Sequence, residues 1–156
     1  LVQKACELGA ARLIPVLTRH TGPTRVNVER LRANAIEAAE QCGRLSLPEV
    51  VAPVRFDAFL AGCERLFWAD EQGGVNACDT FDEAGPGPAT LLIGPEGGFA
   101  EGERAALVAH DGALAISLGP RILRADTAAV SLLTLWQAAA GDWRDDCARQ
   151  STNLPL

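Results

Sequence analysis

Residues 90–141 constrain the fold most, because they hold two glycine-containing loops that each follow a short apolar run and precede a helical pattern. The first loop is Gly94-Pro95-Glu96-Gly97-Gly98, and the second is Leu118-Gly119-Pro120-Arg121-Ile122-Leu123-Arg124. Repeated strand–loop–helix units favour an α/β fold with a mostly parallel sheet flanked by helices. Such sheets bind ligands at the carboxyl ends of their strands. We therefore predict that the two loops lie side by side and share one ligand.

The first unit reads as a buried strand over Leu91–Ile93, a loop, and a helix over Glu101–His110. Gly97 and Gly98 allow positive φ angles and a close approach of the backbone to a ligand, because glycine has no Cβ atom. Acidic residues in the first helical turn suit the positive end of the helix dipole. The loop is therefore expected at a strand end, facing a ligand.

The second unit places a strand over Ala113–Leu118 and a final helix over Asp126–Ala140. Asp126 or Thr127 is the expected N-cap, and capping is favoured for Thr127. This helix is apolar on nearly all sides, so it must be covered on more than one face. Either the rest of the domain or a second subunit provides that cover.

The loops do not match the common phosphate-binding motifs. No Gly-Lys pair occurs in the chain, which excludes a Walker loop. GPEGG has the wrong spacing for a dinucleotide fingerprint, and Glu96 would repel a pyrophosphate. An acidic loop instead tolerates a cationic ligand.

The composition predicts one globular domain, with 156 residues of which 48% are hydrophobic. The net charge of -6 argues against nucleic acid as a partner, yet residues 1–44 carry seven basic and four acidic residues, giving +3 there and -9 beyond. An electrostatic footprint for RNA would lie in that first stretch. A solvated helix face explains the same charges.

The five cysteines form no C-x-x-C pair, which favours free thiols in a reducing cytoplasm and no metal site. His20 and His110 stand apart from any cluster with metal-ligand spacing. No apolar run reaches the length of a membrane span, and no signal peptide is visible.

The first part of the chain reads as a helix over Val2–Leu8 closed by Gly9, then a strand over 12–17 in which Pro15 marks an irregularity or an edge strand. A further helix is capped by Asn27 and ended by Gly43. Arg44 then lies at the surface or projects into a site. The residues that recur at helical spacing in this segment are Val28, Leu31, Ala35, Ala39 and Cys42.

The middle of the chain predicts strands over 49–53 and 65–69, with a small helix between them carrying Phe56, Phe59 and Leu60. Trp68 sits in an apolar run and is expected in the core. Residues 70–88 read as a variable excursion without recognisable chemistry.

Four stretches together resemble one family. GPEGGF and LGPRILRADTA, with Gln3–Gly9 and Glu40–Arg44 upstream, closely resemble the RsmE-type 16S ribosomal RNA uridine N3-methyltransferases of the SPOUT (α/β-knot) superfamily. The resemblance implies a SPOUT domain over 1–143 with a deep C-terminal trefoil knot, a polar tail over 144–156 and a homodimer. It also implies that an N-terminal PUA-like RNA-binding domain is absent from this chain, which begins with Leu1 inside a helical pattern.

The resemblance implies transfer of a methyl group from S-adenosylmethionine to N3 of a uridine in 16S ribosomal RNA. Uracil N3 reacts as an anion, so a positive group is needed beside it. Arg124 is the first candidate and Arg121 the second, while Glu96 balances the sulfonium charge, accepts the N3 proton or fixes its own loop. The expected cofactor-binding residues are Leu92, Ile93, Gly94, Pro95, Glu96, Gly97, Gly98, Phe99, Leu118, Gly119, Pro120, Arg121, Ile122, Leu123, Thr127 and Ala128.

Two positions depart from the family pattern. Ala100 stands where a serine helix cap is usual, and Asp126 stands where glutamate or another polar residue is most common. Two other classes of function compete: a non-catalytic RNA-binding or ribosome-assembly module that kept the loops for structure, and a nicotinamide-dependent oxidoreductase, which the glycine spacing disfavours.

Overall fold

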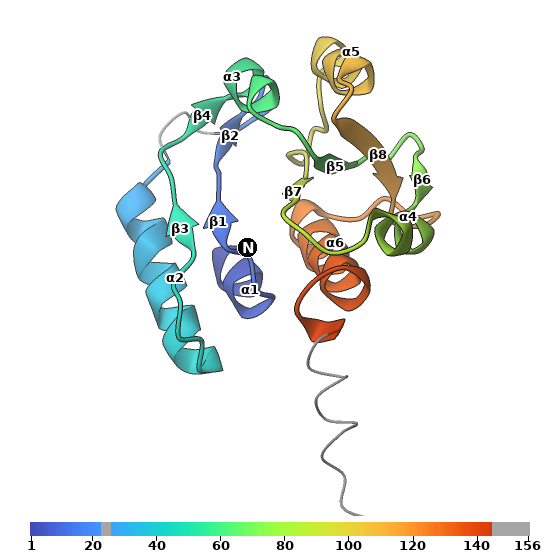
Figure 1. Cartoon of the computed structure of the whole chain (residues 1–156). Helices are drawn as coiled ribbons and strands as arrows, with labels where there is room; N and C mark the ends of the chain where they lie inside the picture. The colour runs from blue at the N-terminus through green and yellow to red at the C-terminus, as the bar shows by residue number, and fades with distance from the viewer. Residues whose placement is uncertain (23–25, 145–156) are drawn as a thin grey trace, which may run out of the picture.

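The computed structural model describes residues 1–22 and 26–144, so the predicted tail lies outside the described residues beyond Arg144. Figure 1 shows the elements in chain order, with pairs of strands between the helices up to α4 and single strands alternating with helices after it. They are α1 (Val2–Glu7), β1 (Arg12–Leu13), β2 (Val16–Leu17), α2 (Val28–Cys42), β3 (Glu49–Val50), β4 (Val54–Arg55), α3 (Phe56–Ala61), β5 (Leu66–Ala69), β6 (Val75–Asn76), α4 (Ala77–Ala84), β7 (Thr90–Leu92), α5 (Glu101–Ala109), β8 (Ala113–Ser117) and α6 (Ala125–Ala139).

The largest sheet has four strands in the order β6-β8-β5-β7, and every neighbouring pair is parallel. In this register Phe67 of β5 lies between Leu91 of β7 and Leu114 of β8. The predicted parallel sheet flanked by helices is confirmed. Since all four strands point the same way, the loops that follow β5, β7 and β8 emerge at one edge.

Both faces of this sheet are covered, as expected for parallel strands. Side chains of β5 alternate between two cores, because successive residues of a strand point to opposite faces. Leu66 and Trp68 pack with α3 and with Leu107 of α5. Phe67 packs on the other face with Phe81 of α4 and with Leu132 and Trp136 of α6. The predicted core position of Trp68 is confirmed, at 1% exposure.

The first part of the chain forms two short parallel pairs, β1 with β3 and β2 with β4. The irregularity predicted at Pro15 divides the expected strand into β1 and β2. The strand predicted over 49–53 was too long, because β3 ends at Val50 and β4 begins separately at Val54. These ladders hold only two residue pairs each, so they extend the fold without adding a second large sheet.

Helix α2 has the predicted ends, with the Asn27 side chain accepting a hydrogen bond from the Arg30 N–H and Gly43 at a φ of 69°. Its buried face is Ala35, Ala38 and Ala39. Cys42 continues the helical spacing of the apolar residues, but it is exposed on the last turn. Small alanines let α1 and α2 pack closely, with Cys6 buried between them.

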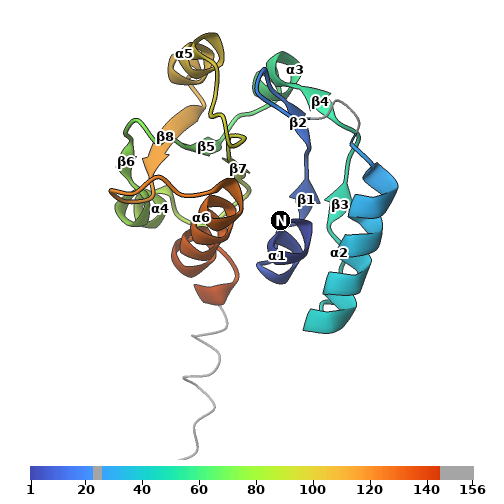
Figure 2. The same cartoon turned by 180° about the vertical axis from the view of Figure 1, so that it is seen from behind.

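Helix α6 is covered on more than one face by its own chain, as Figures 1 and 2 show. Ala128, Ala129, Leu132 and Trp136 are buried. On its other side Gln137 Nε2 donates to the Leu8 carbonyl oxygen at 2.7 Å, joining the last helix to the first. Among the described residues, no helix combines the length and apolar character needed to span a membrane.

Residues 70–88 are more structured than the sequence predicted. They contain β6 and α4, and the Asn76 side chain caps α4 by accepting from the Cys78 and Asp79 N–H groups. Phe81 is fully buried and meets the Phe67 ring edge-on at a centroid distance of 5.1 Å. This segment completes the core on one face of the sheet.

Candidate functional site

A cavity of about 420 Å³ lies at the carboxyl ends of β5, β7 and β8. The two glycine-containing loops line it together, so the predicted shared hollow is present. Its wall also includes the start of α6, one side chain of α5 and the loop after β5. The lining residues are Ala69, Asp70, Glu71, Gln72, Gly73, Ile93, Gly94, Pro95, Glu96, Gly98, Phe99, Arg104, Ile116, Ser117, Leu118, Gly119, Pro120, Arg121, Ile122, Leu123, Arg124, Ala125 and Ala128.

The loop after β7 turns tightly toward the cavity. The Gly98 N–H donates to the Pro95 carbonyl oxygen at 2.8 Å, and Gly98 has a φ of 65°, where a side chain would be strained. Gly97 does not line the cavity and faces outward instead, where a Cβ atom would lie 3.2 Å from His20 Cβ. The loop therefore presents one side to the cavity and the other to the turn after β2.

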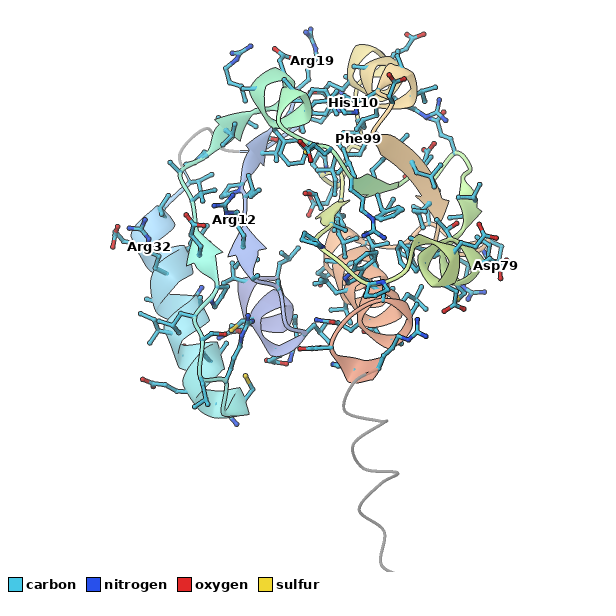
Figure 3. The ribbon with its side chains drawn as sticks, viewed as in Figure 1. Arg12, Arg19, Arg32, Asp79, Phe99 and His110 are labelled. Atoms are coloured by element: carbon cyan, nitrogen blue, oxygen red, sulfur yellow. The ribbon has the colours of Figure 1, made fainter. Side chains whose placement is uncertain are left out.

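Phe99 anchors the end of this loop in the core. Its ring centroid lies 5.8 Å from that of Trp68 and 6.2 Å from that of Phe56. Figure 3 shows Phe99 in the interior of the ribbon, whereas Arg19 lies on the outer rim. Because Phe99 also lines the cavity, it supplies an apolar wall that is fixed by the core behind it.

The loop after β8 leads directly into α6. Gly119 has a φ of 102°, and its N–H donates to Ser117 Oγ at 3.3 Å. The predicted capping by Asp126 or Thr127 was wrong, because the helix begins earlier and Arg124 is the N-cap residue without a side-chain cap bond. The Asp126 carboxylate instead accepts from the Thr127 N–H at 2.8 Å. The first turn of α6 thus borders the cavity.

The loop after β5 forms a third wall, which was not predicted from the sequence. Asp70 is buried, and its carboxylate accepts from Arg104 Nη2 at 2.7 Å and from the Gln72 N–H at 3.1 Å. The hydrogen bond to Asp70 raises the pKa of Arg104 above its ordinary value. Arg104 also lies over the Trp68 ring, 5.9 Å from its centroid. A signal was present, since Asp70 directly follows an apolar strand, as both glycine loops do.

Charges of both signs surround the cavity. Glu71 and Glu96 are exposed carboxylates on its wall, and Arg121 and Arg124 are exposed guanidinium groups on the loop before α6. The wall can therefore hold a cationic group beside a group that develops negative charge. Within residues 1–22 and 26–144, no three potential metal ligands lie together.

Most of the predicted site residues meet in this cavity, including Glu96, Arg121 and Arg124. Three predicted cofactor residues do not line it. Leu92 is buried in the core beneath the loop, Gly97 faces His20, and Thr127 is exposed on the first turn of α6. The geometry brings the other predicted residues together on the wall of one cavity.

Three of the seven basic residues in the first 44 positions form ion pairs with neighbouring carboxylates. Lys4, Arg12 and Arg32 each pair with a carboxylate, at 2.8, 2.7 and 2.9 Å. Arg44 does not line the cavity, and its Nη1 donates to the Cys6 and Ala10 carbonyl oxygens, both at 2.9 Å. Arg44 thus connects α1 to the end of α2. The ion pairs of Lys4, Arg12 and Arg32 reduce the positive charge that this part of the chain can offer to RNA.

Comparison with known proteins shows the family to which this chain belongs. A family described as RNA methyltransferase domain matches residues 1–137. The chain belongs to this family. Two relatives within it, from Rickettsia conorii and Bacillus subtilis, are each named ribosomal RNA small subunit methyltransferase E and are each 33% identical to this chain. The matches cover 85% and 86% of this chain and 55% and 58% of the relatives.

Solved structures of the family agree with the fold. A putative methyltransferase from Legionella pneumophila, in complex with S-adenosylmethionine, matches with a TM-score of 0.81 and 34% identity over 90% of this chain and 60% of its own. Ribosomal RNA small subunit methyltransferase E from Neisseria gonorrhoeae, also bound to S-adenosylmethionine, matches with a TM-score of 0.77 and 27% identity over 89% of this chain and 59% of its own. The predicted SPOUT family and fold are confirmed, and the trefoil knot stays a prediction. The chain spans somewhat more than half the length of these relatives.

Proposed function

We propose that this chain is the catalytic domain of an S-adenosylmethionine-dependent methyltransferase that acts on N3 of a uridine in 16S ribosomal RNA. The observation that carries the proposal is the single cavity formed by the GPEGG and LGPRILR loops at adjacent strand ends. Family membership and relatives that bear the name of a small-subunit ribosomal RNA methyltransferase support it.

The residues of the cavity fit this cofactor. The volume of about 420 Å³ lies within the range of roughly 300–1,000 Å³ that is usual for sites of small ligands. Gly98 and Gly119 keep positive φ angles where a side chain would be strained, so the backbone stands open to a ligand. Ile93, Phe99 and Leu123 supply apolar surface for a nucleoside.

The roles of the residues follow from charge and position. When bound, S-adenosylmethionine supplies a methyl group already activated by a sulfonium centre. The backbone of the two loops would hold it, with Glu96 near enough on the wall to offset a positive charge. Arg124 and Arg121 would stabilise the negative charge on uracil N3, and the two loops would align the methyl group with the attacking nitrogen.

The partners proposed are 16S ribosomal RNA and a second copy of the chain, working in the cytoplasm. Val130 and Leu133 of α6 stay only half-buried, which leaves apolar surface on this helix for a second subunit. Sedimentation velocity over a range of concentrations tests the homodimer. A single species with the mass of one chain at all concentrations would contradict it.

The proposed function is tested by titrating this chain with S-adenosylmethionine and with its demethylated product in a calorimeter. We expect saturable one-site binding of both, and no saturable binding of a nicotinamide cofactor. Absence of binding would instead favour a non-catalytic RNA-binding module. Methyl transfer is then measured on small-subunit RNA with the full-length enzyme, with N3-methyluridine as the expected product.

A further inference from the structure

The GPEGG loop is held from outside by the turn that follows β2. His20 lies in this turn, and its Nδ1 is 2.9 Å from the Gly97 carbonyl oxygen and 3.2 Å from that of Gly98. Carbonyl oxygens only accept hydrogen bonds, so Nδ1 is the protonated nitrogen of the ring. A Cβ atom on Gly97 would lie 3.2 Å from His20 Cβ and 3.5 Å from Nδ1, so the ring rests directly against the loop.

The turn that carries His20 is itself well braced. Thr21 Oγ1 accepts from the Thr18 N–H at 2.8 Å, and the Thr21 N–H donates to the Thr18 carbonyl oxygen at 3.2 Å. The Arg19 N–H donates to Glu103 Oε1 at 2.8 Å, while Glu103 Oε2 accepts from the Ala100 N–H at 2.9 Å. The turn is therefore attached on both sides of Phe99, to the loop through His20 and to the start of α5 through Glu103.

We infer that His20 is a positioning residue, which fixes the cofactor loop in its binding conformation by donating from Nδ1 to the Gly97 and Gly98 carbonyl oxygens. This inference rests on the proposed function, because it concerns affinity for S-adenosylmethionine. His20 does not line the cavity, so it acts through the loop and not on the ligand. Fixing a loop before binding lowers the ordering cost that binding must otherwise meet.

The main test compares affinities for S-adenosylmethionine among variants of this chain. His20→Ala removes the donor and is expected to weaken binding roughly 3- to 10-fold, the effect of losing a typical hydrogen bond. His20→Asn places an amide N–H near the position of Nδ1 and is expected to bind within about 2-fold of the wild type. His20→Gln, whose amide reaches further, is expected to resemble His20→Ala.

His110→Ala is the matched control, because the Nδ1 of the other histidine accepts from the Gly112 N–H at 3.1 Å, away from the cavity. We expect no change in affinity for this control. Wild-type affinity in His20→Ala, or an equal loss in His20→Asn and His20→Ala, would overturn the inference.

Hydrogen–deuterium exchange on the ligand-free chain separates this inference from the proposed function. Residues 93–99 are expected to exchange faster in His20→Ala than in the wild type, and His20→Asn is expected to restore the slower exchange. Unchanged exchange in His20→Ala would refute the anchoring role even if the wild type binds the cofactor. Failure of the wild type to bind S-adenosylmethionine would refute the proposed function. The exchange experiment would still test whether His20 holds the loop in place.

Discussion

Arg124 occupies the junction between the cavity and α6. It is the N-cap residue of the helix through its backbone, and its exposed side chain lines the cavity. Replacing the side chain therefore leaves the cap intact while removing a positive charge from the site. This separation makes Arg124 the clearest position at which to test the proposed chemistry.

We predict that Arg124→Ala lowers methyl transfer by at least about 100-fold, since an electrostatic stabiliser of a developing charge commonly contributes that much. Affinity for S-adenosylmethionine should stay close to that of the wild type. Single-turnover methylation by the full-length enzyme and calorimetry measure the two effects. Arg12→Ala, which removes only an exposed pair with Glu49, is the control. Retained turnover with bound cofactor would remove Arg124 from the chemistry.

Substitution by alanine is predicted to change the stability of the fold in opposite directions at Gly98 and at Gly102. Gly98→Ala is predicted to destabilise the fold by about 1–2 kcal/mol, because its φ of 65° is left-handed and a Cβ atom would lie 3.2 Å from Glu71 Oε1. Gly102→Ala lies in α5 with open space around it and is predicted to stabilise by about 0.5 kcal/mol. Urea unfolding of both variants measures these changes. Equal effects of the same sign would contradict the assigned backbone conformations.

Several residues of the site could be predicted from sequence because their types are restricted by backbone geometry. Gly98 and Gly119 mark positive φ angles, and the apolar runs before their loops mark strands. The pairing of Asp70 with Arg104 was not predicted, because the two residues are 34 positions apart in sequence and no local pattern encodes such a pair. His20 was likewise read only as an isolated histidine. The long-range hydrogen-bond partners of single polar side chains can be identified only once the fold is known.

At the scale of elements, α5 begins without a side-chain cap. Ala100 has the extended conformation of an N-cap residue, with φ of -62° and ψ of 154°, but its methyl group accepts no hydrogen bond. The Glu103 side chain already bonds back to the Ala100 N–H. Half of a capping box is therefore in place.

Ala100→Ser is predicted to stabilise the chain by about 1 kcal/mol, because the serine oxygen would accept from the first turn of the helix. Ala105→Ser, at an exposed position inside the same helix, is predicted to destabilise slightly because serine has a lower helix propensity than alanine. Chemical denaturation measures both. A loss of stability in Ala100→Ser would show that the site does not admit the hydroxyl group.

The elements that were predicted best from the sequence are long and have clear start and stop signals. Helix α2 was predicted at both ends because Asn27 and Gly43 are strong start and stop signals. The start of α6 was placed too late because Arg124 caps through its backbone alone. Strands β3 and β4 hold two residues each, and so short a run gives no periodicity from which to locate a boundary.

For the whole molecule, Gln137 connects the two ends of the fold. It is 6% exposed, its Nε2 donates to the Leu8 carbonyl oxygen, and its Oε1 accepts from the Asp142 N–H at 3.1 Å. Gln137→Ala is predicted to cost roughly 1–3 kcal/mol, because both backbone groups lose a partner. Thermal and urea unfolding measure the loss. Gln41→Ala, on the exposed side of α2, should change stability little, and an equal loss there would argue against a specific role for Gln137.

The cavity wall is drawn from the loops after β5, β7 and β8, Arg104 of α5 and the first turn of α6, which meet only after three parallel strands have paired. No short stretch of the unfolded chain can reproduce it, so an occupant has affinity for the native state alone. Its binding energy then adds to the free energy of unfolding, by about 2.7 kcal/mol at a free concentration one hundred times Kd. Occupancy of the cavity by the proposed cofactor would therefore raise the temperature at which this molecule unfolds.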